Sequence, residues 1–334
     1  MCTKKLSYIQ LLRAVAAILV VMFHSSVATS KYSDFPARSS ELLSLGAYGV
    51  DLFFVISGFV IFYANSNFTP GEFLRRRLER IVPIYWLFIL IAVPLALHAA
   101  GAQFSWTRLL ASLGFVSFLH ESGSILYVGW TLEFEMLFYL CTALAMLLRR
   151  YRWHALCVAI ATLVGLGALM PSSTPTVNFL TSPFMLEFLA GILVARWIQT
   201  RRVGKVEGLA LVIAAAMVTL LKENYRFLWL GIPASLLVWC GAALGDRALP
   251  RWLVAMGDAS FSIYLLQVFT VAACARLMHA VYPHLDPDLF VLLATLVTVL
   301  AGMASYRWLE VPIRDYFRYR RHASGRQLNG GDAA

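Results

Sequence analysis

Long apolar segments recur along the whole chain and are separated by short polar stretches. Ten of them are close to the length that a helix needs to cross a bilayer, and they cover residues 6–28, 46–65, 81–99, 129–148, 154–170, 179–198, 207–221, 227–243, 255–278 and 289–309. A further apolar stretch, Leu109 to Leu119, is too short to cross, and we expect it to be re-entrant or interfacial. The pattern predicts an all-α, polytopic membrane protein of about ten transmembrane helices.

Composition supports a membrane protein rather than a soluble one. Of the 334 residues, 60% are hydrophobic and 14% are charged, whereas soluble domains carry about a quarter of charged residues. The formal charge of +10 does not indicate nucleic-acid binding, because the basic residues gather at the ends of the apolar segments. The five cysteines have no metal-ligand or redox spacing.

The distribution of basic residues predicts the orientation in the membrane. Of the 28 Lys and Arg residues, 21 fall on one side of the ten spans, six fall on the other, and Arg13 lies within the first span. The positive-inside rule therefore places both termini in the cytoplasm. Residues 1–313 are expected to form one integral-membrane domain, and residues 314–334 a basic cytoplasmic tail that is partly disordered.

Two polar residues interrupt the first apolar segment. Arg13 and His24 are eleven residues apart, which corresponds to about 1100° of helix rotation, so both side chains share one face about 16 Å apart. Ionisable groups within a membrane span usually face a protein interior or an aqueous cavity. The simpler interpretation is a polar clamp between helices. A cleavable signal peptide is disfavoured because Arg13 interrupts the apolar core.

Carboxylates also occur within the apolar segments. Glu135 lies one to two turns inside a helix of mostly apolar residues, which favours a functional role. Asp51 has a structural alternative, because it can cap the start of the second span. An imidazole beside a carboxylate can accept a proton from a hydroxyl near neutral pH, so Glu135 is a candidate partner of His24. Contact between them is a hypothesis that the sequence does not test.

A basic cluster follows the second span. Four arginines occur within six residues, at positions Arg75, Arg76, Arg77 and Arg80. Guanidinium groups bind phosphates with two hydrogen bonds, so this cluster is a candidate phosphate site. A plain positive-inside anchor explains it equally well. The sequence has no glycine-rich phosphate loop, no Gly-x-Ser-x-Gly nucleophile motif and no His/Cys metal spacing.

Six short motifs, in this order, resemble those of the membrane acyltransferase 3 family, bacterial O-acyltransferases that modify cell-surface glycans. They are Leu11-Leu12-Arg13-Ala14 with His24, Gly49-Val50-Asp51-Leu52-Phe53-Phe54-Val55-Ile56-Ser57-Gly58-Phe59, Arg77-x-x-Arg80-Ile81-x-Pro83-x-Tyr85-Trp86, Trp130-Thr131-Leu132-Glu133-Phe134-Glu135 with Phe138-Tyr139, Ser260-Phe261-Ser262-Ile263-Tyr264-Leu265-Leu266, and Glu310-Val311-Pro312. The resemblance covers nearly the whole chain and is nearest to the exopolysaccharide O-acetyltransferases. Gln267 and Met136 depart from the family pattern, which commonly has His and a second acid there.

The resemblance implies a transfer of an acetyl group from acyl-CoA, without a metal, to a hydroxyl of an exported polysaccharide or lipid-linked oligosaccharide. It implies a donor-phosphate role for Arg76, Arg77 and Arg80, and a donor-guiding role for Arg13. His24, assisted by Glu135, would act as general base or carry the acyl group, while Asp51, Ser57 and Tyr264 would contact substrate. The membrane lipids and polysaccharide-assembly proteins are expected partners, and nucleic acid is not.

The alternative function is a proton-coupled transporter or exporter of a sugar or lipid-linked glycan, in which Arg13, His24 and Glu135 form a proton relay. A structural role in a glycan-export complex is a third possibility. The sequence shows no inverted-repeat pattern and no matched pair of broken helices, which favours the transferase.

Overall fold

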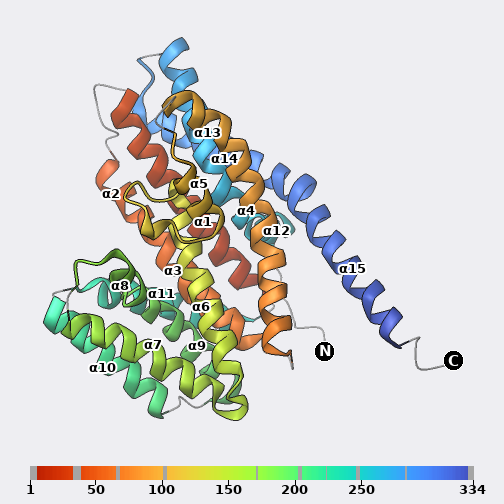
Figure 1. Cartoon of the computed structure of the whole chain (residues 1–334). Coiled ribbons are helices and arrows are strands. Elements are labelled where there is room, and N and C mark those ends of the chain that lie inside the picture. The colour runs from red at the N-terminus through yellow and green to blue at the C-terminus, as the bar shows by residue number, and fades with distance from the viewer. Residues whose placement is uncertain are drawn as a thin grey trace.

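The computed structural model describes residues 6–32, 39–64, 68–100, 104–170, 172–201, 205–222, 224–245, 249–282 and 284–329. All regular secondary structure in these ranges is helical (Figure 1). Nine helical segments of the described chain are long and apolar enough to cross a membrane. They confirm a multi-pass, all-α membrane protein, and they contain the helices α1 (Ser7–Tyr32), α3 (Gly49–Tyr63), α4 (Pro70–Ala100), α6 (Trp130–Met146), α7 (Arg152–Leu169), α9 (Met185–Thr200), α11 (Ile232–Leu244), α13 (Ser260–Val281) and α14 (Pro287–Ser305).

The other described helices connect or extend these segments. They are α2 (Ser40–Ser44), α5 (Trp106–Leu113), α8 (Pro175–Leu180), α10 (Lys205–Lys222), α12 (Arg251–Asp258) and α15 (Val311–Asn329). The tenth span expected from the sequence, 207–221, is α10, which packs on α7 and α9. Its ends carry charged residues, and its exposed side chains include Leu209, Val212 and Leu220. An exposed apolar face of this kind is what a lipid-facing helix presents.

Several predicted helix boundaries are wrong by a few turns, because hydropathy shows where the chain becomes apolar and not where a helix begins. The expected span 81–99 is the second part of α4, which begins eleven residues earlier at Pro70. Hydropathy rises only after the arginine cluster, but Arg, Leu and Glu all favour a helix, so the helix continues through the polar stretch. Pro70 stands at the first helical position, where its missing N–H costs nothing. The arginine cluster is therefore helical.

One other expected span also differs from the structure. The span 255–278 is divided into α12 and α13, which meet at Ala259. The basic tail is helical as far as Asn329, within α15 (Val311–Asn329), and its last residues, 330–334, lie outside the described residues. Figure 1 shows α15 projecting away from the other helices.

The close approach of α3 and α9 depends on two glycines. A Cβ atom on Gly58 would lie 2.0 Å from the carbonyl oxygen of Phe188, and one on Gly191 would lie 2.0 Å from that of Val55. Small residues let helix backbones meet closely, which is the usual way that helices associate within lipid. This contact holds the functional face of α3 in a defined position.

The helices form two groups in Figure 1. The helices α1, α12, α13 and α14 pack on one another, whereas α7, α9, α10 and α11 form the green group on the lower left. α3 contacts α1 in the first group and α9 and α11 in the second. α3 also packs against α6, and a central space lies where α1, α3, α4, α6 and α13 meet.

The segment between α4 and α6 does not cross as one helix. The apolar stretch 109–119 contains the end of α5, an eight-residue helix, and a short 3-10 turn at Ser117–Leu119. Arg108 holds the following loop, because its Nε donates to the carbonyl of Gly123 at 2.9 Å and its Nη2 donates to that of Ser124 at 2.8 Å. The segment is thus an ordered cap at this end of α6.

Candidate functional site

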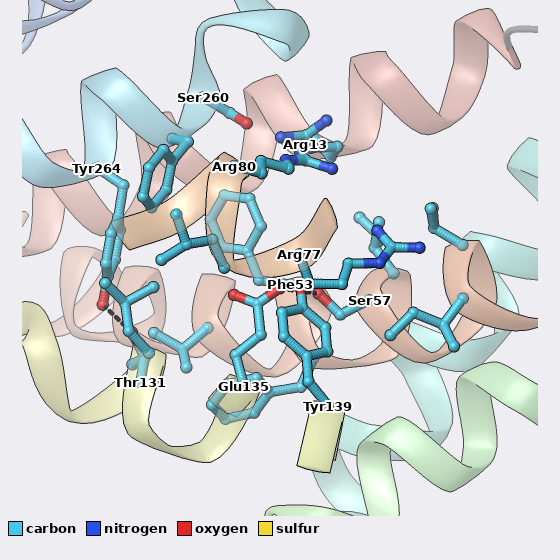
Figure 2. A pocket seen from close by; sticks show the side chains of 18 of the residues that line it. Arg13, Phe53, Ser57, Arg77, Arg80, Thr131, Glu135, Tyr139, Ser260 and Tyr264 are labelled. Carbon is cyan, nitrogen blue, oxygen red and sulfur yellow. Dashed lines mark hydrogen bonds between the residues drawn. The ribbon is translucent and has the colours of Figure 1, made fainter. Parts of the chain in front are cut away.

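A polar cavity lies between five helices and has a volume of about 190 Å³ (Figure 2). It has room for part of a substrate rather than for a single water molecule. Its polar lining comes from α1, α3, α4, α6 and α13 and consists of Gln10, Arg13, Ser57, Arg77, Arg80, Thr131, Glu135, Tyr139, Ser260 and Tyr264. The lining includes residues from five of the six sequence motifs. In this way, groups far apart in the sequence surround one space.

Three arginines line the cavity, namely Arg13, Arg77 and Arg80. None of them forms an ion pair with a residue in the described part of the chain. Arg13 donates to the amide oxygen of Gln10 at 3.2 Å, and Arg77 lies over the rings of Phe73 and Tyr139. Figure 2 shows the Arg13 and Arg80 side chains on the same side of the cavity. Adjacent guanidinium groups repel one another, so this arrangement favours an anionic ligand.

Arg76, also expected to bind phosphate, is placed differently. Its guanidinium donates to Glu72 one turn earlier in α4, at 3.2 and 2.7 Å, and lies 4.1 Å from the centre of the Phe68 ring. Arg76 does not line the cavity that contains Arg77 and Arg80. Helix periodicity does not account for this separation, because Arg80 is four residues from Arg76 and three from Arg77. The contacts of Arg76 with Glu72 and Phe68 hold its guanidinium away from the cavity.

Glu135 is the carboxylate of the cavity lining. Its Oε1 accepts a hydrogen bond from the Ser57 hydroxyl at 3.2 Å and another from the Tyr139 hydroxyl. Figure 2 shows the carboxylate between Tyr264 and Arg77, directed into the cavity. Among the described residues Glu135 has no hydrogen bond to His24, so the structure does not place these two groups in direct contact.

Tyr264 lines the cavity on the side away from Arg77 (Figure 2). Its hydroxyl lies 2.8 Å from that of Thr131 and donates to the carbonyl of Val128 at 3.1 Å. Thr131 lies in the first turn of α6 and Val128 in the 3-10 turn Tyr127–Gly129 just before it, so Tyr264 joins α13 to the start of α6. The tyrosine is consequently fixed in place with its ring against Phe53.

The sixth motif reaches the same region from the junction of α14 and α15, where Glu310 ends the π-helical turn Tyr306–Glu310. Glu310 accepts a hydrogen bond from Ser262 at 2.7 Å, which connects the fifth motif to the sixth. The charges of Glu310 and Asp258 also act on Arg13, although neither carboxylate lines the cavity. These acids reduce the local excess of positive charge and leave the guanidinium donors of Arg13 facing the cavity.

His24 lies further along α1 and does not line the cavity. Its Nδ1 lies 2.9 Å from the carbonyl oxygen of Val20. A carbonyl oxygen only accepts, so this contact assigns the hydrogen of the neutral ring to Nδ1 and leaves the lone pair on Nε2. The tautomer is therefore the one in which Nε2 can accept a proton.

Two residues connect His24 with the surrounding spaces. Gln267 lies beside the imidazole, and its Nε2 donates to the backbone oxygen of Tyr264, which lines the cavity, at 2.9 Å. On another side, the ring of Tyr127 lies 4.9 Å from the imidazole. Tyr127 lines a separate depression together with Arg108, Phe118, Trp130 and Phe179. His24 thus lies between the polar cavity and an aromatic depression.

Asp51 lies outside the polar cavity, in an ion pair. Its two oxygens accept from Nε and Nη2 of Arg226 at 2.9 and 2.7 Å, and the Asp51 side chain is 1% exposed. Arg226 also lies over the rings of Tyr48 and Phe184, and the buried Glu187 interacts with both members of the pair. The carboxylate that was expected to contact substrate is thus occupied by a residue 175 positions away.

Glu133 has a structural explanation. Its carboxylate accepts from the backbone N–H of Ser117 at 2.6 Å, from the Ser117 hydroxyl and from the N–H of Phe118 at 3.2 Å. These bonds attach the segment after α5 to α6. Glu133 does not line the polar cavity, whereas Glu135 does.

Several residues of the cavity lining had no role predicted from the sequence. Gln10 precedes Arg13 by one helical turn, which is a signal that helix periodicity could have supplied. Tyr139 follows Glu135 by one turn and bonds to it. Ser260 offered no comparable signal, because its place in the lining depends on how α13 packs.

Among the described residues, no three His, Cys, Asp or Glu side chains are grouped so that they could hold one metal ion.

The chain is similar in sequence to known acyltransferases. A family model described as an acyltransferase domain matches residues 6–307. The exopolysaccharide production protein ExoZ of Rhizobium meliloti (strain 1021) is 32% identical over 305 residues, which cover 86% of this chain and 96% of ExoZ. The acyltransferase MdmB of Streptomyces mycarofaciens is 29% identical over 276 residues, or 71% of each chain. The search of solved structures finds no match.

Proposed function

Because the chain belongs to the acyltransferase 3 family and is a membrane O-acyltransferase, we propose that it transfers an acetyl group from acetyl-CoA to a hydroxyl of an envelope or exported polysaccharide. The relative ExoZ is named for exopolysaccharide production, which supports a glycan acceptor. The basic residues around the spans support a bacterial inner membrane with both chain ends in the cytoplasm.

One observation carries the choice of donor. Arg13, Arg77 and Arg80 face one cavity without an ion-pair partner in the described chain. Guanidinium forks bind phosphate oxygens with two parallel hydrogen bonds, and acyl-CoA has a pyrophosphate. In the proposed complex Arg77 and Arg80 hold the pyrophosphate, and Arg13 lies beside the arm that carries the thioester.

The thioester end of the donor points along the cavity toward Tyr264. Arg13 and His24 share a face of α1 about 16 Å apart, so a long, flexible arm held by the arginines can extend toward the imidazole. Gln267 contacts both Tyr264 and His24, so it lies on the path from the cavity to the imidazole. The cavity as described stops at Tyr264, so the proposal requires Tyr264 or its neighbours to move when the donor binds.

In the transfer step Nε2 of His24 takes the proton of the acceptor hydroxyl, and the hydroxyl oxygen attacks the thioester carbonyl. The C–S bond breaks, an ester forms, and the CoA thiolate receives the proton from the imidazolium. Glu135 acts through the field of the cavity rather than by direct contact with His24, because its Oε1 is bound by Ser57 and Tyr139. Val20 keeps the imidazole in the reactive tautomer.

The acceptor is proposed to approach from the aromatic depression beside Tyr127. Tyr127 and Trp130 are partly exposed there, and aromatic faces provide flat apolar surfaces against which sugar rings pack. This replaces the expectation that Asp51 shapes the acceptor side, since Asp51 is paired with Arg226.

A vesicle assay distinguishes transfer from proton-coupled transport. Sealed inner-membrane vesicles that contain the protein are supplied with radiolabelled acetyl-CoA on the cytoplasmic face and with polysaccharide from the producing strain. We expect label in ester linkage to the polysaccharide. Uptake of a sugar or glycan driven by a pH gradient, with no acetylation, would instead establish the transporter.

A genetic comparison tests the acceptor. Mass spectrometry of the surface polysaccharide from a deletion strain should lack ester-linked acetyl groups that the parent strain carries. Complementation with the wild-type gene should restore them. An unchanged ester content in the deletion strain would contradict a polysaccharide acceptor.

A further inference from the structure

A second cavity adjoins the polar cavity at Arg77 and Ile61, which line both. It lies where the end of α3, the start of α4, the end of α6 and the start of α7 meet, and it has a volume of about 120 Å³. Its cationic lining residues are Arg76, Arg77 and Arg152, and its aromatic ones are Phe68, Phe73 and Trp153. No role for Arg152 or Trp153 follows from the motifs or from the transfer step.

The charges of this second cavity are only partly balanced. Glu72 pairs with Arg76. Arg152 forms no ion pair with a described residue, and its guanidinium lies 5.3 Å from the centre of the Trp153 ring. A half-buried guanidinium beside an indole offers phosphate hydrogen bonds and a flat π surface within one small space. This combination suits a nucleotide better than it suits a simple anion.

The order of the two cavities matches the order of groups in coenzyme A. The pyrophosphate separates the pantetheine arm from an adenosine that carries a 3′-phosphate. Since Arg77 lines both cavities, a pyrophosphate held there leaves the arm in the polar cavity and directs the nucleotide toward Arg152. The second cavity is the adjoining space on that side.

We infer that the second cavity binds the adenosine 3′-phosphate end of the donor, with Arg152 contacting the 3′-phosphate and Trp153 packing on the adenine. The inference rests on the proposed acyl-CoA donor and adds a site that selects CoA over carriers without the 3′-phosphate. The inference assigns the phosphate contact to Arg152 and not to the neighbouring Arg149 and Arg150. Those two side chains are exposed and fit the positive-inside anchor.

The test measures binding of three ligands to the full-length protein in lipid nanodiscs, by competition with radiolabelled acetyl-CoA. The ligands are CoA, 3′-dephospho-CoA and acetyl-phosphopantetheine. Wild-type protein should bind CoA about tenfold or more tightly than 3′-dephospho-CoA, since a charge-assisted phosphate contact is removed. Binding needs no acceptor, so the assay does not depend on identifying the glycan.

Variants assign this preference to single residues. Arg152→Gln should bind CoA and 3′-dephospho-CoA within about twofold of each other, with unchanged affinity for 3′-dephospho-CoA, which also shows that the variant is folded. Arg150→Gln is the matched control and should keep the tenfold preference. Trp153→Leu should weaken both nucleotides by the same factor and leave acetyl-phosphopantetheine unaffected.

The outcomes separate this inference from the proposed function. If wild-type protein binds CoA and 3′-dephospho-CoA equally, or if Arg150→Gln loses the preference as fully as Arg152→Gln, the second cavity is not the 3′-phosphate site while the donor assignment stands. If neither ligand competes with radiolabelled acetyl-CoA, or if acetyl-CoA itself does not bind, the acyl-CoA donor is wrong and the inference fails with it.

Discussion

One arginine of this membrane domain is held by a counter-charge of the protein, whereas a set of three arginines is not. Arg226 donates to both oxygens of the buried Asp51 and packs on two aromatic rings, so its charge is satisfied within the protein. Arg13, Arg77 and Arg80 face a cavity and have no ion-pair partner in the described chain. Paired charges of the first kind stabilise one packing of helices, whereas unpaired ones of the second kind are available to a ligand.

The difference shows why residue type alone does not identify a functional group in a membrane protein. Asp51 and Glu135 are both carboxylates on apolar helices, and both belong to sequence motifs. Asp51 neutralises an arginine of the same protein, while Glu135 accepts only hydroxyl hydrogen bonds and lines the cavity. Substitutions in the two regions should therefore affect different measurements, and the following predictions begin with the largest effect.

The largest effect is expected for His24→Ala, which removes the proposed general base. The loss of rate should be about 10²- to 10⁴-fold with little change in thermal stability, because general base catalysis contributes on this scale. Acetyl transfer by purified protein gives the rate. His98→Ala, at an exposed position near the end of α4, is the control and should be active. Wild-type O-acetylation by His24→Ala would show that the imidazole is not the base.

Substitution within the Asp51–Arg226 ion pair should lower the unfolding free energy rather than the activity. Asp51→Asn leaves Arg226 without its main partner, and we expect a loss of about 2 kcal/mol of unfolding free energy. This is less than for a fully buried pair, since the Arg226 side chain is 31% exposed and Glu187 stays nearby. A thermal unfolding curve in detergent measures it, and activity per folded molecule should persist. Lost activity at unchanged stability would place Asp51 in the substrate site after all.

A smaller effect is expected when the shape of the cation changes but its charge remains. Arg77→Lys should raise the KM for acetyl-CoA about tenfold with little change in kcat, because a lysine cannot form the two-pronged contact with phosphate. Arg75→Lys is the matched control, since Arg75 pairs with Glu79 outside the cavity. Equal KM values for both variants would indicate that the arginines only anchor α4 at the membrane surface.

The smallest effect is expected for Ser57→Ala, which removes one of the two hydrogen bonds to Glu135. The bond is 3.2 Å long and Tyr139 keeps the second one, so kcat should fall about two- to fivefold, equivalent to at most about 1 kcal/mol. Ser235→Ala is the control, because Ser235 donates only to Gly231 in its own helix region. A complete loss of activity would mean that Ser57 contacts the substrate directly.

Much of the fold could be predicted from local patterns. Apolar segments of bilayer length identified the crossing helices, and the resemblance carried by six motifs agrees with the family match over residues 6–307. Boundaries such as the start of α4 were wrong, because hydropathy locates the edge of the apolar region and not the end of the helix. The helix continues as long as its backbone hydrogen bonds and residue propensities allow.

The candidate site was only partly predictable. Helix periodicity places Arg13 and His24 on one face of α1, but it does not separate Arg76 from Arg80, which are four residues apart in α4. It does not reveal that Ser57 bonds to Glu135, a residue 78 positions away, or that Gln267 lies beside His24. The first contact depends on how α3 packs against α6, and the second on how α13 packs against α1.

The sequence by itself determined that this protein crosses a membrane many times and carries ionisable groups within its spans, because hydropathy and helix period are local properties of the chain. Only the tertiary structure decided which of those groups are neutralised and which face a cavity. The docking of distant helices pairs Asp51 with Arg226. It leaves Arg13, Arg77 and Arg80 facing a cavity without an ion-pair partner among the described residues. In a low-dielectric interior, the presence or absence of a nearby counter-charge separates a structural ion pair from a binding site.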